Sequence, residues 1–436
     1  MDKKRIGVIS LGCDKNRVDS EKMLFELSTF AEITNDISNA QIIIINTCAF
    51  LEESRKEAIE TILECDSLRD NGVLEKIVVT GCLPQKFISE LFEELTEVDL
   101  FLGTADYSLI KFGIQEIYKN KRLNLVKQGQ ELSCGRVLTT PSHYAYLKVA
   151  DGCNNFCTYC LIPSIRGKIK STPIEELKQE VILLGGVKEL ILVAQDLTNY
   201  GIDIYGKPSL VKLLKELSSL KEVGSIRLLY CYPELIDEEL ILEIANNPKI
   251  IKYVDIPMQH ADDSVLKRMN RRGSGQDYLK IVKRLQSLGV AVRSTFIAGF
   301  PGETEEQFLN LVNFIRQAKL FNAGFFAYSK EEGTASFNLK GHLPAKTKKQ
   351  RVRQLYKEQK EIVKQNLKSF IGKTLDVVCD GIDFDKQSFF GRAYFSAPLI
   401  DGVVYFTSDE DIVQGETYKV KITKIKNYDL YGGVII

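Results

Sequence analysis

Three cysteines within eight residues are the feature that most constrains this chain. They have the spacing Cys153-x-x-x-Cys157-x-x-Cys160 and lie on a predicted loop after a short strand over 145–149. Spacers of only three and two residues keep the three thiols close together, so the loop can wrap around one compact ligand. A cubic iron–sulfur cluster normally takes four thiolates, so three would leave one iron open to a small molecule. A zinc site with a distant fourth ligand, or a disulfide with one thiol left over, is the alternative. Ten cysteines in a chain without an export signal favour metal or redox chemistry over disulfides.

A second set of cysteines follows strand-like runs in the first 118 residues. The runs cover 5–10, 41–46 and 76–80, and they lead into Cys13, Cys48 and Cys82. Helix-like segments over 19–29, 51–65 and 84–95 follow them, and this alternation predicts a doubly wound parallel sheet. Loops at the carboxyl ends of such strands share one edge of the sheet. We therefore expect a second cluster with these three ligands; the alternative is three small buried residues at strand ends.

The remaining chain divides by pattern into three parts. Residues 119–140 are polar and irregular, as in a linker. Residues 141–342 repeat the strand–helix alternation, which predicts a parallel partial barrel whose site lies just after its strands. From about 371 onward, short alternating strands predict a small antiparallel barrel.

Charge limits the partners. The formal net charge is zero, so any contact with nucleic acid must depend on a local patch. The helical segment 346–368 has nine basic residues against Glu358 and Glu361, which indicates a solvated face or an RNA or ribosome contact. Residues 371–436 hold ten acidic and seven basic side chains, a balance better suited to a basic protein than to RNA. The sequence has no membrane-length apolar run and no signal peptide, so we expect a cytoplasmic protein without a membrane partner.

These motifs together resemble a known family. The cysteine spacing and Tyr159 are similar to the signature of the radical S-adenosylmethionine (SAM) superfamily. The whole chain resembles the methylthiotransferases, which implies an N-terminal domain over 1–118, a radical SAM domain over 139–368 and a TRAM barrel over 369–436. It looks like the branch that modifies a ribosomal protein rather than the branch that modifies tRNA adenosine. The residues that carry this likeness are Ser10-Leu11-Gly12-Cys13, Lys15-Asn16, Val18-Asp19-Ser20-Glu21, Ala194-Gln195-Asp196, Pro257-Met258-Gln259-His260, Gly391-Arg392, Ala397-Pro398 and Asp401-Gly402. Asp14 departs from the proline or alanine expected after the first cysteine.

The resemblance implies the transfer of a methylthio group to the β-carbon of an aspartate in small-subunit ribosomal protein S-twelve. It implies two 4Fe–4S clusters and SAM as cofactors. The catalytic cluster would be held by Cys153, Cys157 and Cys160, and the sulfur-donating one by Cys13, Cys48 and Cys82. We further expect a flavodoxin-like or similar electron donor and a monomer, with tRNA a less favoured partner.

Assignments around SAM follow from the same resemblance. Gly185 and Gly186 would let the backbone approach the SAM amino group, unless they are a helix-ending pair. Gln195 and Asp196 would bond polar groups of SAM. Arg293 would pair with the SAM carboxylate as a fork, with a structural salt bridge as the alternative.

Further positions and rival functions stay open. His260 and Tyr232 are candidates for facing the substrate, with buried wall positions as the alternative. Four other cysteines, Cys65, Cys134, Cys231 and Cys379, have no partner at a useful spacing. The rival functions are a tRNA adenosine methylthiotransferase with the same chemistry and a non-catalytic metal protein that binds ribosomes.

Overall fold

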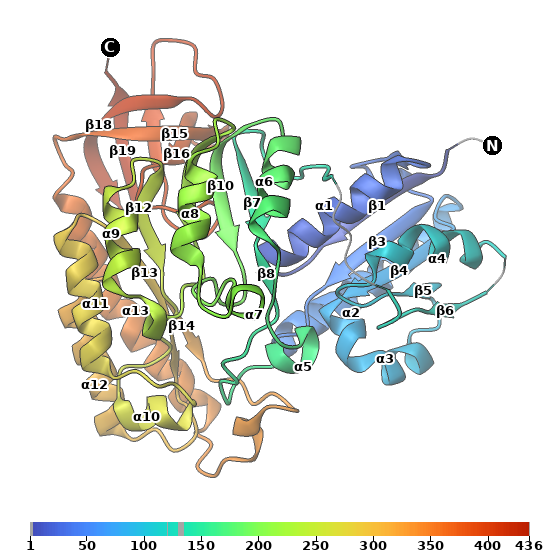
Figure 1. Ribbon diagram of the computed structural model, residues 1–436, viewed down its shortest axis with the longest axis horizontal. Helices are drawn as coiled ribbons and strands as arrows, with labels where there is room; N and C mark the ends of the chain where they lie inside the picture. Colours follow the sequence, from blue (N-terminus) through green and yellow to red (C-terminus); the bar gives the residue numbers. More distant parts are fainter. Residues whose placement is uncertain (1–2, 120, 130–134, 436) are drawn as a thin grey trace. The chain divides into compact units, whose positions relative to one another are not determined.

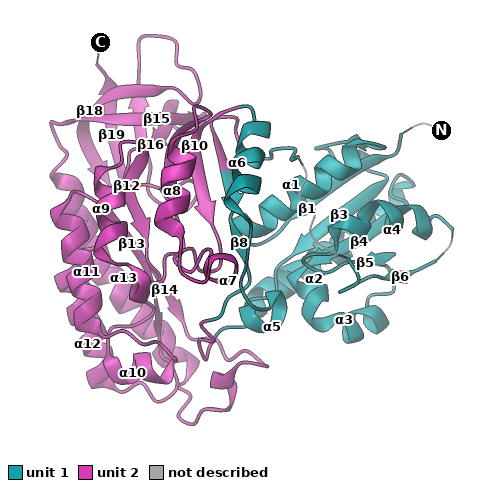
Figure 2. Cartoon of the chain, viewed as in Figure 1, with its two compact units in different colours: residues 1–139, 146–154, 160–185 teal, residues 140–145, 155–159, 186–436 magenta. Residues whose placement is uncertain are grey.

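Two compact units divide the chain (Figure 2). The computed structural model describes residues 3–119, 121–129 and 135–435. Unit 1 holds residues 1–139, 146–154 and 160–185, and unit 2 holds residues 140–145, 155–159 and 186–436. Cys134 lies outside the described residues, and the boundaries of the three predicted domains stay a prediction.

Unit 1 is built on a six-stranded parallel sheet with the order β2-β1-β3-β4-β5-β6 (Figure 1). Its strands are β1 (Arg5–Ser10), β2 (Glu32–Ile33), β3 (Ile42–Thr47), β4 (Lys76–Gly81), β5 (Leu100–Phe101) and β6 (Leu123–Asn124). The chain runs from β1 to β2 on one side and then to β3 on the other, which is the doubly wound arrangement expected from the sequence. The short strand β6 lies inside the predicted linker, so that segment is not wholly irregular.

The central strand β3 shows why this sheet is covered on both faces. Ile42 and Ile44 pack in one core with α1 (Asp14–Ser28) and α4 (Ile110–Ile117), while Ile43 and Ile45 pack in another with α2 (Glu52–Ser67) and α3 (Cys82–Glu94). Successive side chains of a strand point to opposite faces, so an uninterrupted apolar run fits only a sheet with two covered faces.

The last part of unit 1 surrounds the Cys153–Cys160 loop. It contains the short antiparallel pair β8 (Ala150–Asp151) and β9 (Lys170–Ser171), then α5 (Ile162–Arg166) and α6 (Ile174–Leu183). Leu161 and Ile165 belong to the same core as α2 and α3, so α5 is anchored to the sheet's own hydrophobic interior.

The main sheet of residues 141–342 has the order β14-β13-β12-β11-β10-β7 and is not closed. Its strands are β7 (Tyr144–Lys148), β10 (Val187–Val193), β11 (Val223–Leu228), β12 (Ile250–Asp255), β13 (Ala291–Ala298) and β14 (Asn322–Ala327). The intervening helices are α7 (Ile202–Tyr205), α8 (Leu210–Ser218), α9 (Glu238–Asn246), α10 (Asp263–Arg268), α11 (Gly275–Ser287) and α12 (Glu305–Ala318), and α13 (Ala345–Lys368) follows the last strand. The parallel pairings from β10 to β14 confirm the predicted partial barrel.

A closed barrel of five strands ends unit 2. It consists of β15 (Thr374–Asp383), β16 (Ser388–Arg392), β17 (Val404–Thr407), β18 (Thr417–Lys426) and β19 (Asp429–Val434). The barrel was expected, but it is not wholly antiparallel, because β17 and β19 pair in parallel. Among the described residues, none of the helices has the length and apolar character needed to cross a membrane.

Candidate active site

The first cysteine set lies where the sheet of unit 1 changes direction. Cys13 directly precedes α1, Cys48 follows β3, and Cys82 begins α3 right after β4. Strands β1, β3 and β4 are neighbours in the sheet, and the switch in strand order falls between β1 and β3. The carboxyl edge at such a switch point is where open α/β sheets bind their ligands. The three thiols therefore meet at one ligand-binding edge.

Gly12 lets the loops of this edge come together. Its φ of +96° lies in the left-handed region, and a Cβ atom built there would lie 2.8 Å from the Cβ of Cys48. Any other residue at position 12 would clash with Cys48, and glycine also adopts the positive φ without strain.

Asn16 connects all three loops and is fully buried. Its side-chain nitrogen donates to the carbonyl of Leu11 at 3.2 Å and to that of Thr47 at 3.0 Å, beside Cys13 and Cys48 respectively. Its Oδ1 lies 3.8 Å from the Cys13 sulfur and 3.9 Å from the Cys82 sulfur. One side chain thus fixes the relative positions of the three strand ends.

Arg166 approaches the same edge from the end of α5, with its side chain only 2% exposed. Its Nη2 donates to Asn16 Oδ1 at 2.6 Å and to Asp19 at 3.2 Å, and lies 3.8 Å from the Cys82 sulfur. Its Nη1 donates to Asp151 at 2.6 Å. The guanidinium therefore stands between two carboxylates and a thiol.

Lys148 completes this buried ionic cluster. It pairs with Asp19 and with Asp151, so two cations face two carboxylates inside unit 1. Burial alone would raise the pKa of Asp151, but the charges of Arg166 and Lys148 hold it well below its usual range. Asp151 is thus present as an anion that orients Arg166.

Burial dominates the acidity of the thiols at this edge. Burial raises the pKa of Cys82 to about 12, although the charge of Arg166 acts in the opposite direction. Burial also raises the pKa of Cys48. Without a bound metal the thiols of Cys48 and Cys82 are therefore protonated at neutral pH. Thiols must lose their protons to bind iron, so a cluster that binds at this edge would release protons.

The Cys153–Cys160 loop is held by backbone contacts in unit 1. The Cys153 amide donates to the carbonyl of Gly167 at 3.1 Å, and the Ile169 amide donates to Asn154 Oδ1 at 3.1 Å. The Cys160 sulfur accepts from the amide of Ile162 at 3.4 Å, the first residue of α5. The chain after Cys160 therefore turns directly into the helix that carries Arg166.

Within unit 2, Asp196 and Asn270 hold the middle of the same loop. Asp196, after β10, accepts from the side-chain amide of Asn155 at 2.7 Å, and Asn270, after α10, donates to the carbonyls of Asn155 and Phe156 at 3.1 and 3.0 Å. Phe156 has a φ of +50° and is 55% exposed. A strained, exposed aromatic residue is held in place here, directly before Cys157.

Tyr232 and Arg271 flank Cys157 in unit 2. The Tyr232 hydroxyl lies 3.8 Å from the Cys157 sulfur, and the Arg271 guanidinium lies 4.2 Å from the centre of the Tyr232 ring. Arg271 also donates to the Tyr159 hydroxyl at 3.2 Å and to the Pro257 carbonyl at 2.7 Å. These contacts place Tyr232 beside the loop thiol, at the carboxyl ends of the strands where barrel sites lie.

The donor set fits iron–sulfur clusters better than a single ion. None of the described cysteines forms a disulfide. No three His, Cys, Asp or Glu side chains in the described part of the chain converge closely enough to share one metal ion. Thiolates around a cubic cluster stand farther apart, because each binds a different iron. Asn16 and Arg166 supply the polar partners that usually surround metal ligands.

The structure does not bring every predicted SAM residue to this edge. Gly185, with φ +75°, ends α6, and Gly186 leads into the amino end of β10, whereas Gln195 and Asp196 follow its carboxyl end. The seven residues of β10 separate the two ends by roughly 23 Å. The glycine pair therefore lies at a helix end, the alternative given above, and its contact with SAM stays a prediction.

Two other predicted side chains make internal contacts. Arg293 pairs with Asp255 at 2.8 Å and with Asp401 at 3.3 Å, the salt-bridge arrangement given above as its alternative, and its SAM contact stays a prediction. His260 is completely buried; its Nδ1 accepts from the Asp262 amide and its Nε2 lies 3.5 Å from Glu303. His260 thus has the buried wall position given above as its alternative, and a substrate contact of Tyr232 stays a prediction.

Sequence reasoning missed Asn16 and Arg166 as parts of the site. Asn16 was quoted only as part of a family motif, although a buried asparagine three residues after a strand-end cysteine suits an organising role. Arg166 gave no local signal, because its partners Cys82 and Asn16 are far away in the sequence. Asn155, Asn270 and Arg271 were missed for the same reason.

Comparison with known protein families covers most of the chain. Residues 5–103 match an uncharacterized protein family, UPF0004, residues 147–315 match the radical SAM superfamily, and residues 371–435 match the TRAM domain. Radical SAM proteins use a 4Fe–4S cluster and SAM.

Several curated proteins are similar to this chain over its full length. The ribosomal protein uS12 methylthiotransferase RimO of Clostridium tetani is 46% identical over 446 residues, covering 100% of this chain and 99% of that protein. The RimO proteins of a Thermoanaerobacter species and of Caldanaerobacter subterraneus are 44% and 45% identical, each covering 98% of this chain and 99% of its own length.

Solved structures share the fold at low sequence identity. The radical SAM methyltransferase TsrM from Kitasatospora setae, with cobalamin and a [4Fe-4S] cluster bound, has a TM-score of 0.56 at 14% identity and covers 75% of each chain. The cobalamin-dependent radical SAM enzyme OxsB has a TM-score of 0.51 at 12% identity and covers 83% of this chain and 56% of its own. These likenesses show the fold alone.

Proposed function

Because the chain belongs to the RimO family of ribosomal protein uS12 methylthiotransferases, we propose that it adds a methylthio group to the β-carbon of an aspartate in ribosomal protein uS12. The observation that carries this proposal is the convergence of Cys13, Cys48 and Cys82 at one sheet edge, in a chain that also has the Cys153-x-x-x-Cys157-x-x-Cys160 loop. A single-cluster radical enzyme would not need the first set.

The target bond explains why two cysteine sets are required. An aspartate β-carbon carries an unactivated C–H bond, whose proton is far too weakly acidic for a protein side chain to remove at neutral pH. When bound, two 4Fe–4S clusters and SAM supply radical hydrogen abstraction, sulfur and a methyl group. The protein contributes ligands, orientation and exclusion of water.

The first cysteine set is organised to hold one cluster. Asn16 fixes the three loops relative to each other, and Arg166 presents its positive charge to the Cys82 sulfur. A cation next to a thiolate ligand favours the deprotonated form, which offsets part of the burial penalty. We assign Cys13, Cys48 and Cys82 as the three protein ligands of this cluster.

The second set is Cys153, Cys157 and Cys160. Asp196 and Asn270 hold Asn155 and Phe156, so the loop keeps one shape before Cys157. Asp196 also accepts from the backbone amide and hydroxyl of Thr198, which orients its carboxylate toward the loop. Asp196 therefore has a positioning role here, and contacts of Gln195, Asp196 and Arg293 with SAM stay predictions.

The charge of the C-terminal barrel suits a basic protein substrate, because residues 371–436 carry three more acidic than basic side chains. The electron donor, which we expect to be flavodoxin-like or similar, and the monomeric state of the chain belong to this proposal as well.

A transfer assay tests the function directly. The anaerobically reconstituted chain would be given SAM labelled in the methyl group, with purified uS12 and hypomodified tRNA as parallel substrates. We expect label on the uS12 aspartate and none on tRNA. Labelled tRNA together with unlabelled uS12 would favour the rival tRNA enzyme and overturn the proposal.

A variant that lacks one cysteine of the Cys153–Cys160 loop tests whether this loop is needed for SAM cleavage. Cys157→Ala removes one thiolate of the second set, so we expect it to abolish 5′-deoxyadenosine formation from SAM. The matched control is Cys379→Ala, a buried cysteine on β15 of the C-terminal barrel that belongs to neither set. Continued 5′-deoxyadenosine formation by Cys157→Ala would contradict the ligand assignment.

A further inference from the structure

The outer face of α13 carries a continuous row of cations. Seven exposed basic side chains recur every three or four residues along this helix, and we call them the α13 stripe: Lys346, Lys349, Arg353, Lys357, Lys360, Lys364 and Lys368. At 3.6 residues per turn they fall within an arc of about 100° and extend over roughly 33 Å. The spacing therefore gathers seven positive charges on one face of one helix.

The other basic side chains of α13 make contacts inside the protein. Lys348 donates to the Tyr328 carbonyl at 2.7 Å, and Arg351 pairs with Glu303 and Glu305. Glu358, on the flank of the helix, is bound by Arg316. Within the described part of the chain, no ion pair neutralises any member of the α13 stripe.

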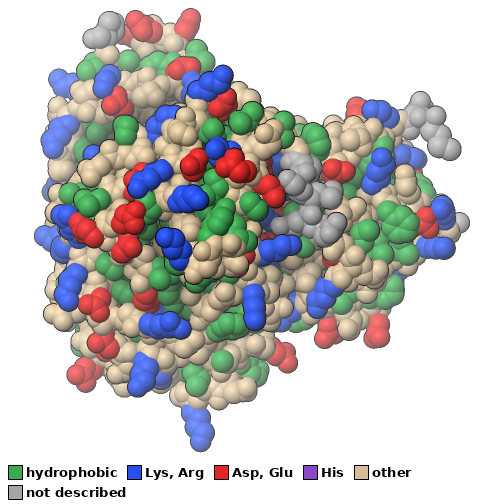
Figure 3. Space-filling view, in the orientation of Figure 1, with side chains coloured by type: hydrophobic (Ala, Val, Ile, Leu, Met, Phe, Trp, Pro, Cys, Tyr) green, Lys and Arg blue, Asp and Glu red, His purple; other side chains and the backbone are tan. Residues whose placement is uncertain are grey.

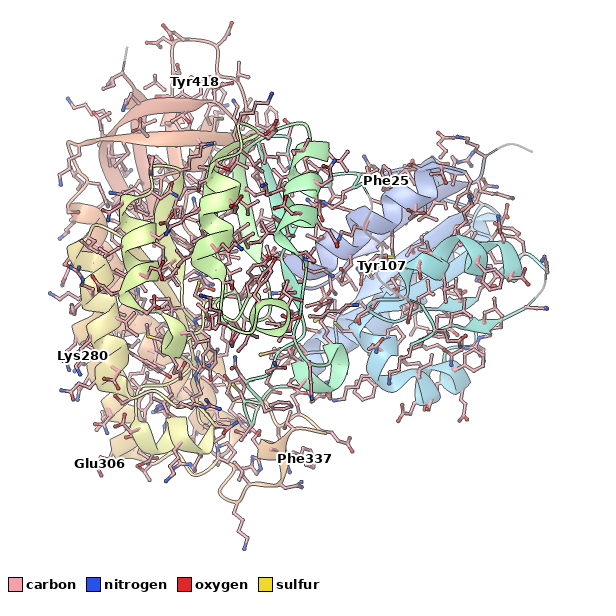
Figure 4. All side chains as sticks on the ribbon, viewed as in Figure 1. Phe25, Tyr107, Lys280, Glu306, Phe337 and Tyr418 are labelled. Carbon is pink, nitrogen blue, oxygen red and sulfur yellow. The ribbon has the colours of Figure 1, made fainter. Side chains whose placement is uncertain are left out.

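The neighbouring helix α11 pairs two of its exposed cations. On α11, Lys280 pairs with Asp277 and Arg284 pairs with Glu238. Figure 4 labels Lys280, which projects outward from that helix. The face drawn in Figure 3 likewise shows basic and acidic side chains interspersed. An unpaired row of one sign is unusual in a chain whose formal net charge is zero.

We propose that the α13 stripe binds the phosphate backbone of RNA. Successive members stand about 5 Å apart along the helix axis, close enough together for neighbouring cations to contact neighbouring phosphates. Contacts of this kind position a protein on a nucleic acid without reading its sequence. The exposed Glu361 lies beside the stripe, so seven cations less one carboxylate leave this face a net charge of +6, which suits phosphate contacts.

An acidic protein partner fits this face less well. Stable protein interfaces have an apolar centre within a polar rim, but the large apolar side chains Leu355, Ile362, Val363 and Leu367 of α13 are buried inside unit 2. Tyr356 is 42% exposed, but its ring packs edge-on against Phe325, so the stripe lies beside a single aromatic ring and not beside an apolar centre. The acidic balance of the barrel further directs RNA to α13.

The inference goes beyond methylthio transfer and rests on the proposed function only in naming the ribosomal target. A ribosomal protein is surrounded by RNA once it is assembled. A stripe that holds RNA phosphates would favour the assembled substrate over isolated uS12, and it would do so without touching the reacting aspartate.

Fluorescence anisotropy with a labelled RNA hairpin tests the proposal on the full chain. The stripe variant replaces four central cations: Arg353→Gln, Lys357→Gln, Lys360→Gln and Lys364→Gln. The control variant replaces four exposed lysines elsewhere in unit 2: Lys207→Gln, Lys252→Gln, Lys280→Gln and Lys283→Gln. Both sets lie on exposed surface, and circular dichroism checks that each variant keeps its helix content.

We expect the stripe variant to bind the hairpin at least about tenfold more weakly at low salt, and its plot of log affinity against log salt to be shallower by about 3 to 4. The control variant should match the wild type in affinity and slope. Equal affinity and slope for the stripe variant and the wild type would overturn the proposal, and so would polyglutamate binding as tight as the hairpin at the same salt.

A second measurement separates this inference from the function itself. We expect the stripe variant to modify isolated uS12 at the wild-type rate and uS12 within small ribosomal subunits more slowly. An equal rate on both substrates would contradict RNA docking while leaving the methylthiotransferase function intact. Loss of label on both substrates by the wild type would contradict the function but not the RNA binding.

Discussion

The Nη2 atom of Arg166 lies 3.8 Å from the sulfur of Cys82. Arg166 ends the short helix that begins right after Cys160, and Cys82 begins a helix of the N-terminal sheet. The helix that follows the second cysteine set therefore supports the first cysteine set. Because both residues belong to unit 1, we expect one side chain to affect both the folding of α5 and any cluster binding at the first set.

Arg166→Gln should destabilise the chain and loosen the first set. The change removes the cation that faces Asp19, Asp151 and Cys82, and breaking one partner of a buried ion pair costs about 3 kcal/mol. The measurement is the urea midpoint of the metal-free chain, together with its iron content after reconstitution.

Two control variants test the Arg166 result. Arg166→Lys keeps the positive charge but not the forked guanidinium, so we expect its urea midpoint and iron content to lie between those of the wild type and Arg166→Gln. Lys168→Gln changes an exposed neighbour and should behave as the wild type. If Arg166→Gln had the wild-type urea midpoint and iron content, the supporting role of this side chain would be wrong.

Asn16→Ala should reduce iron in the first set while leaving SAM cleavage by the second set intact. The variant leaves the carbonyls of Leu11 and Thr47 without their donor, which costs about 1–3 kcal/mol for each buried group. Iron content and 5′-deoxyadenosine formation are measured on one preparation, with the exposed Asn71→Ala as the control. A full iron content in Asn16→Ala would show that the three loops keep their positions without it.

The buried pair of Glu189 with Arg392 predicts a pH-dependent stability. Burial alone would raise the pKa of Glu189, but Arg227 and Arg392 outweigh it and hold the pKa below its usual value. A lowered folded-state pKa means that the stabilisation is present above the unfolded pKa of about 4.3 and is lost as the pH falls through the folded pKa.

Glu189→Gln removes this dependence. At pH 7 we expect the variant to be less stable than the wild type by about 3 kcal/mol, with the gap narrowing below about pH 4. Urea midpoints of the wild type, Glu189→Gln and the exposed control Glu239→Gln, measured from pH 7 to pH 3, check this. A gap that stays constant over this range would show that the charge of Glu189 contributes nothing.

The strand-end cysteines could be predicted because the signal was local and strong. An apolar run such as Ile42–Thr47 marks a strand buried on both faces, and parallel strands end at one edge. Asn16 and Arg166 could not be placed, since their roles depend on contacts between loops that only the assembled sheet creates. The residues themselves look ordinary in the sequence.

Two sequence predictions were wrong in part, for physical reasons that recur. Alternating polarity predicts strands but not their direction, so the parallel pairing of β17 with β19 was not foreseen. The predicted linker contained β6 because a two-residue strand leaves no periodic pattern.

The central claim is that two separate cysteine sets each hold one cluster, and counting iron and sulfide tests it most directly. Anaerobically reconstituted wild-type chain should hold about eight irons and about eight sulfides. Cys82→Ala should hold about four irons and still cleave SAM, whereas Cys157→Ala should hold about four and fail to cleave it. A wild-type chain with only about four irons, or Cys82→Ala with all eight, would contradict the account.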